Sequence, residues 1–161
     1  PLERPQGLQD HPVATGAPFA LAGSPAPAEL ERYYAGADRL LRALRDRNPG
    51  FSSVLCWPHH FDLAMLMPLD RQADAETVRS IGVGLSPGDG GRPEPYFYVL
   101  PWPRPTGDLP ALDGGRWNTE GWVGAVLEAA DFTTAGSNGA QRGRIERFLN
   151  SAVQACRQLL A

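Results

Sequence analysis

Apolar residues recur at helical spacing in two long stretches of the chain. Between residues 27 and 48 they fall three or four positions apart, until Asn48-Pro49-Gly50 interrupts the pattern. Pro27 suits the first turn of a helix, where its missing N–H would have no intrahelical partner. A second apolar stripe runs from Ile145 to Leu160. Both stretches predict amphipathic helices that each pack one face against a core.

The segments between these helices have the character of strands. Residues 80–86 alternate strictly between apolar side chains and glycine or serine, which places the apolar side chains on one face of a sheet and leaves the other face bare. The turn at 87–91 and the strand-like residues 94–100 predict a hairpin. Residues 51–57 and 61–67 predict two further strand segments, parted by Pro58 because proline cannot donate to a sheet ladder.

We therefore expect an α+β fold with an antiparallel sheet of about four strands, packed by two longer helices and rich in loops. Residues 120–130 predict a third helix. This prediction is weaker than the other two because Gly121 and Gly124 disfavour a helix. Residues 1–26 lack periodicity and predict an extended N-terminal arm, while residues 27–161 predict one α+β domain. A chain of 161 residues with 42% hydrophobic content can bury one proper core, and its 16 prolines and 18 glycines require long irregular connections.

Charge and composition argue against several classes of function for this protein. The net charge is −3, which argues against a binder of nucleic acid or of an anionic membrane, because their affinity rests on clustered basic residues. All 15 basic residues are arginine, a bias typical of a GC-rich bacterial genome, and this excludes lysine-based catalysis. No apolar run approaches the roughly 20 residues of a membrane span, and the N-terminus lacks the apolar core of a signal peptide. We expect a reduced, cytoplasmic protein.

The hexapeptide Trp57-Pro58-His59-His60-Phe61-Asp62 contains two of the three histidines. If a strand begins at His60, its side chain and that of Asp62 share a face. The bare face of the hairpin would present glycines beside tyrosines, with an aspartate in the turn above. The candidate ligand-binding residues are Trp57, His59, His60, Asp62, Asp89, Glu94, Tyr96 and Tyr98.

The same residues leave several chemistries open. His60, Asp62 and Glu94 are weak candidates for a metal site or for acid/base catalysis, although their spacing is not specific to either and a structural role is the commoner outcome. Ser86 precedes Pro87, which removes an oxyanion-hole donor and argues against a serine hydrolase. Cys56 is expected to be inert core, and the sequence does not decide whether it meets Cys156.

Several short motifs occur in a characteristic order: Ala37-Asp38-Arg39 in the first helix, Trp57 before Phe61-Asp62-Leu63-Ala64, the Ser86-Pro87-Gly88 turn, and Glu94 before Phe97-Tyr98 with Pro101 and Pro103 beyond. Together they resemble the C-terminal half of a bacterial domain-of-unknown-function family, over residues 30–105. That family has no established activity, so the resemblance implies no catalytic residues. It implies a longer parent protein in which another sheet-forming half precedes this one.

Two functional hypotheses follow. The first is a non-enzymatic module that binds a small molecule or a protein partner through its tyrosine, tryptophan and glycine face. The alternative is a metal-dependent or acid/base enzyme that uses His60, Asp62 and Glu94. The sequence identifies no cofactor. Exposed sheet edges predict association, either as a homo-oligomer or with a companion N-terminal fragment.

Overall fold

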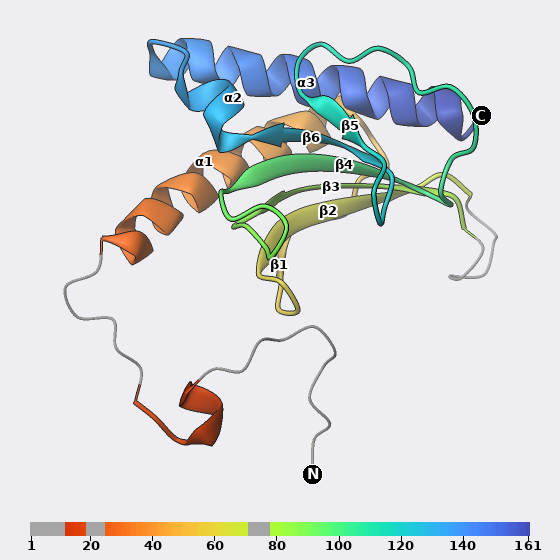
Figure 1. Ribbon diagram of the computed structural model, residues 1–161. Coiled ribbons are helices and arrows are strands. Elements are labelled where there is room, and N and C mark those ends of the chain that lie inside the picture. The colour runs from red at the N-terminus through yellow and green to blue at the C-terminus, as the bar shows by residue number, and fades with distance from the viewer. Residues whose placement is uncertain (1–11, 19–24, 71–77) are drawn as a thin grey trace.

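Six antiparallel strands form one sheet in the order β1-β2-β3-β4-β6-β5 (Figure 1). The computed structural model describes residues 12–18, 25–70 and 78–161. The α+β class and the antiparallel sheet are confirmed, whereas the prediction of about four strands is wrong because the sheet has six. The strands are β1 (Leu55–Trp57), β2 (Asp62–Pro68), β3 (Ser80–Ser86), β4 (Tyr96–Trp102), β5 (Arg116–Asn118) and β6 (Gly124–Glu128).

Two helices of 22 residues each, α1 (Ala26–Arg47) and α3 (Asn138–Leu159), are the two longer helices that the periodicity predicts. The Ser137 side chain caps α3 by accepting a hydrogen bond from the Ala140 N–H. Two short helices, η1 (Pro12–Thr15) and α2 (Ala129–Thr133), complete the described chain. Most of the predicted arm at 1–26 lies outside the described residues. No helix in the described part of the chain is both long and apolar enough to cross a bilayer.

The helix predicted over residues 120–130 is wrong, because this segment forms strand β6 and only then the short helix α2. Ala125 and Leu127 belong to the main core, and Val126 is equally buried on the opposite face of the sheet. A strand that is apolar on both faces lacks alternation and cannot be distinguished by pattern from a buried helix. β5 has only three residues, too few to show any period.

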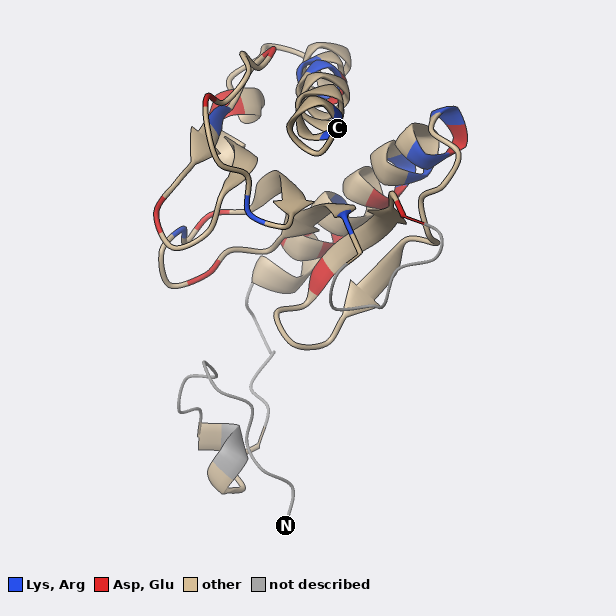
Figure 2. Cartoon of the chain, turned by 90° about the vertical axis from the view of Figure 1, so that its right-hand side faces the viewer, with Lys and Arg blue, Asp and Glu red and all other residues tan. Residues whose placement is uncertain are grey.

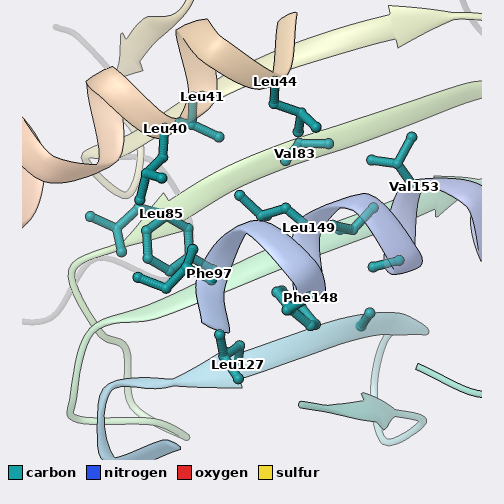
Figure 3. Packing of buried hydrophobic residues seen from close by; sticks show 14 of the residues in the cluster. Leu40, Leu41, Leu44, Val83, Leu85, Phe97, Leu127, Phe148, Leu149 and Val153 are labelled. Carbon is teal, nitrogen blue, oxygen red and sulfur yellow. The ribbon is translucent and has the colours of Figure 1, made fainter. Parts of the chain in front are cut away.

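Both long helices lie on the same side of the sheet (Figure 2). Between helices and sheet lies the main hydrophobic core, in which Leu41 and Leu44 of α1 and Phe148 and Leu149 of α3 are at most 1% exposed (Figure 3). The strands contribute every second residue to this core. These strand residues are Met65, Met67, Ile81, Val83, Leu85, Phe97, Val99, Ala125 and Leu127.

The other face of the sheet, which we call the open face, has neither long helix across it (Figure 1). The cross-strand pairs Leu55–Ala64, Ala64–Gly84, Gly84–Tyr98 and Tyr98–Val126 run across it. Several of the large apolar side chains that are exposed belong to this face, namely Leu55, Trp57, Leu66 and Trp102. The open face therefore combines exposed apolar area with the polar residues described next.

Candidate functional site

One transverse row of side chains crosses the open face at the end where β3 turns into β4. Trp57 pairs with Asp62, and Ser86 pairs with Tyr96, which in turn pairs with Glu128. The ladder between β2 and β3, extended by one pair beyond Leu63–Leu85, places Asp62 beside Ser86. Directly paired residues project from the same face, so the register brings these side chains into one line: Trp57, Asp62, Ser86, Tyr96 and Glu128.

Asp62 lies at the centre of this row and is half-buried. Burial raises the pKa of its carboxyl group, and hydrogen bonding with the hydroxyls of Tyr98 and Ser86 opposes that rise only in part. The Oδ1 atom is enclosed and has no hydrogen-bond partner among the residues that the structure describes. A buried polar atom without a hydrogen-bond partner is uncommon in folded proteins, and among the described residues of the open face Asp62 Oδ1 shares this property with Nε of Arg92.

Tyr98 lies over Gly84, one row further along the sheet. A Cβ atom at Gly84 would lie 2.7 Å from the Tyr98 hydroxyl oxygen and 2.8 Å from Cβ of Ala64, so this close approach requires glycine. Burial, the charge of Asp62 and hydrogen bonding to it raise the pKa of Tyr98 well above its ordinary value. The phenol therefore remains protonated at neutral pH and faces the Asp62 carboxyl group as a donor.

Asp89 and Tyr96 form a second polar pair beside the row. The Tyr96 hydroxyl donates to Oδ2 of Asp89 at 2.6 Å, and Oδ1 accepts from the backbone N–H groups of Gly91 and Arg92 at 2.7 and 2.8 Å. Burial acts to raise the pKa of Asp89, but these hydrogen bonds outweigh it and lower the pKa. Burial and the bond to Asp89 raise the pKa of Tyr96 to about 12. This pair fixes the β3–β4 turn over the end of the row.

Arg92, in the same turn, covers the β4–β6 side of the row. Its guanidinium group lies 5.6 Å from the ring centre of Tyr96 and 5.8 Å from that of Trp122. Nη2 donates to Oδ1 of Asn118 at 2.7 Å, and Nε lies 3.2 Å from Oε1 of Glu128. Glu128 therefore offsets only part of the charge of Arg92, because it also pairs with Arg116. The row is accessible from its β1–β2 side, where Trp57 is 49% exposed.

The hairpin loop between β1 and β2 holds the two histidines. β2 begins at Asp62, so the expectation that a strand from His60 onward aligns these two residues is wrong. His59 and His60 are exposed, with ring centres 4.2 Å apart. The charge of His60 nevertheless acts to lower the pKa of Asp62, which places the imidazole within electrostatic range of the carboxyl group.

The cysteines do not meet, since both are free thiols. Cys56 is exposed in β1, so its expected role as inert core is wrong, because β1 is an edge strand. Cys156 is buried in α3, and burial raises its pKa to about 12.

Glu94 is exposed and does not belong to the row. Its charge, after burial and the charge of Glu29, contributes to the raised pKa of Tyr33 in α1, so Glu94 lies toward the first helix. Within the described residues, no group of three or more histidine, cysteine, aspartate or glutamate side chains is arranged to hold a metal ion. The geometry accordingly gives no support to a metal site formed by His60, Asp62 and Glu94.

The structure thus brings together Trp57, Asp62, Asp89, Tyr96 and Tyr98 from the predicted set, while His59 and His60 lie in the adjacent loop. Two neighbouring residues escaped the sequence reasoning as site residues. One is Ser86. Its place on the bare face of residues 80–86 indicates a hydrogen-bonding role, whereas Pro87 argues only against a role as nucleophile. Arg92 lies in a glycine-rich turn, and no pattern distinguishes it from a solvated charge.

No family model, no curated protein and no solved structure matches this chain. The resemblance to the C-terminal half of a domain-of-unknown-function family therefore stays a prediction.

Proposed function

We propose that this chain is a binding module that recognises a small organic cation at Asp62, on the open face of its sheet. The observation that carries the proposal is the half-buried carboxyl group of Asp62, which lies beside the exposed indole of Trp57 and whose Oδ1 atom has no donor among the described residues. A cationic ligand with an N–H or hydroxyl donor would supply that hydrogen bond, and its positive charge would add Coulombic attraction to the carboxylate.

Local charge supports a cation. The carboxyl groups of the row are Asp62 and Glu128, and Asp89 lies beside it. The charge of Asp89 acts to raise the pKa of Asp62. Arg92 and Arg116 both pair with Glu128 of β6, which is separated from Asp62 of β2 by two strands. A cationic ligand would therefore meet net negative charge at Asp62.

An aromatic wall supports an organic ligand. Trp57 is the direct cross-strand partner of Asp62, and their Cβ atoms project from the same face about 5 Å apart. A half-exposed indole beside a carboxylate is the arrangement that attracts alkylammonium groups, because the ring face and the carboxylate both bind positive charge. The exposed side chain of Leu55, two residues away on the same face, would contact the apolar part of such a ligand.

Isothermal titration calorimetry with choline tests the proposal, with its uncharged isostere 3,3-dimethylbutanol as the matched ligand control. We expect saturable binding of choline alone. Asp62→Asn should weaken it by about tenfold or more, and Trp57→Leu by about 2- to 30-fold. Asp113→Asn changes the net charge equally at an exposed position away from the row and should leave the affinity unchanged. Equal binding of both ligands, or no binding of choline, putrescine or agmatine, contradicts the proposal.

The acid/base alternative is reduced to Asp62 with His60, since Glu94 lies toward α1. A carboxyl group with a raised pKa beside an imidazole suits proton transfer. If the bound cation is converted to a product in the presence of wild-type protein and not of Asp62→Asn, the binding module is an enzyme.

A further inference from the structure

A groove opens between α1 and α3, on the opposite side of the sheet from Asp62. The two helices approach each other toward their C-terminal ends, where Nη2 of Arg157 lies 3.4 Å from Oδ1 of Asn48. Toward their N-terminal ends they diverge (Figure 1). The groove between the diverging halves has a volume of about 650 Å³, which lies within the roughly 300–1,000 Å³ of small-molecule sites.

Aromatic rings form the base of this groove. Phe132 of α2 packs edge-on against Phe97 of β4, with ring centres 5.8 Å apart, and against Tyr33 of α1 at 6.4 Å. Leu40 of α1 lies near Phe97 at this end of the core (Figure 3). On the α1 wall, a Cβ atom added at Gly36 would meet no atom within 4 Å. The groove therefore has an aromatic base and free space beside a glycine, while Asn138 and Gln141 make its α3 wall partly polar.

Arginines form the rim. Arg32 and Arg39 from α1 and Arg142 from α3 line the groove, and no lining residue is acidic. Arg142 is paired with Glu146 at 2.9 Å, whereas Arg32 and Arg39 have no ion-pair partner among the described residues. Two further carboxylates, Glu29 and Glu94, act on the groove, since their charges contribute to the raised pKa of the Tyr33 hydroxyl. Two guanidinium groups that have no ion-pair partner in the described part of the chain thus lie above an apolar base.

We propose that this groove binds an amphipathic anion of the acyl-carboxylate class, with its carboxylate at Arg32 and Arg39 and its chain against Gly36 and the aromatic base. Arginine binds carboxylates in bidentate fashion, and the apolar base would hold the chain by the hydrophobic effect. This site is separate from the cation site at Asp62 and of opposite charge preference.

Calorimetric titration with sodium decanoate, below its micellar concentration, tests the proposal. Decyltrimethylammonium, titrated into Asp62→Asn so that the cation site does not contribute, is the charge-reversed control. We expect saturable binding of decanoate and none of the cationic surfactant at this groove. Gly36→Leu fills the free space while improving helix propensity, so the variant should fold and lose the binding. Gly143→Leu, in α3 and outside the groove lining, is its matched control and should bind as the wild type does.

A double variant tests the charge independently of the filled groove. Arg32→Gln with Arg39→Gln should weaken decanoate binding about tenfold or more, and Arg42→Gln with Arg45→Gln, on the same helix but outside the lining, should not. Binding that is absent from the wild type, unchanged in both test variants or equal for the cationic surfactant overturns the assignment. A dimer in sedimentation that Gly36→Leu dissociates would overturn it too, because a second copy would then fill the groove.

Discussion

The hydroxyl group of Tyr34 in α1 donates a hydrogen bond to the carbonyl oxygen of Phe61 in the β1–β2 loop. Phe61 has a left-handed φ of 58°, a conformation that costs a non-glycine residue roughly 1–2 kcal/mol. The bond ties the loop to the first helix immediately before Asp62. The position of Asp62 at the start of β2 thus depends on a contact between residues 27 positions apart.

Tyr34→Phe removes this hydrogen bond and keeps the ring. We expect the free energy of unfolding to fall by about 1 kcal/mol, with faster amide exchange at residues 59–61, because the strained loop loses its tether. Urea denaturation and hydrogen-exchange mass spectrometry measure both effects. Tyr33→Phe is the matched control, since the Tyr33 hydroxyl has no hydrogen bond within the described residues. Equal losses in the two variants would show that the bond to Phe61 does not hold the loop.

The two glycines of β3 on the open face should respond differently to alanine. In Gly84→Ala the new Cβ atom would lie 2.7 Å from the Tyr98 hydroxyl oxygen, so we expect a loss of about 1–3 kcal/mol from overpacking and weaker choline binding as Tyr98 moves from Asp62. In Gly82→Ala the nearest atom lies 3.8 Å away, at Cβ of Leu100, an ordinary contact. Thermal and urea unfolding of both variants compare them directly. If Gly84→Ala is as stable as Gly82→Ala, Tyr98 does not lie over Gly84.

The raised pKa of Asp62 makes a prediction about stability and pH. Its pKa is higher in the folded chain than in the unfolded chain, so the stability it contributes is full below the unfolded value of about 3.9 and is lost as the pH rises through the folded value. Asp62→Asn should therefore be at least as stable as the wild type at pH 7, and the wild type should lose stability relative to it above about pH 4. Urea unfolding across pH 3–8 measures the difference.

Asp89→Asn supplies the control of opposite sign. The pKa of Asp89 is lowered in the folded chain, so its contribution to stability is present above about pH 4 and fades as the pH falls. The variant should be less stable than the wild type at pH 7, with the difference shrinking in acid. If both variants change stability in the same direction with pH, the assignment of the two carboxyl groups is contradicted.

Local periodicity was sufficient to predict the parts of the fold that have one buried face. The stripes of α1 and α3 and the alternation of β3 made these elements evident, and the same alternation correctly placed Asp62, Tyr96 and Tyr98 on the face away from the core. β6 was missed because Ala125, Val126 and Leu127 are buried on both faces. A strand that is apolar on both faces has no alternation of apolar and polar residues by which it could be recognised.

The candidate site depends on contacts between residues that lie far apart in the sequence. Alternation brings Tyr98 and Asp62 to one face, but the order of the strands decides that they are near neighbours. Arg92 reaches Asn118, 26 residues away in the chain, and Tyr34 reaches Phe61 across 27. Such contacts depend on tertiary packing, and no periodicity along the chain encodes them.

The central claim is that a small organic cation binds at Asp62 beside Trp57. A choline titration followed by ¹⁵N-resolved NMR tests it most directly, because the Trp57 indole N–H and the Asp62 amide report on the row while the Gly36 amide reports on the groove between α1 and α3. The account predicts saturable shifts at Trp57 and Asp62, none at Gly36, and their loss in Asp62→Asn. Shifts that persist in Asp62→Asn, that centre on Gly36, or that never saturate would contradict it.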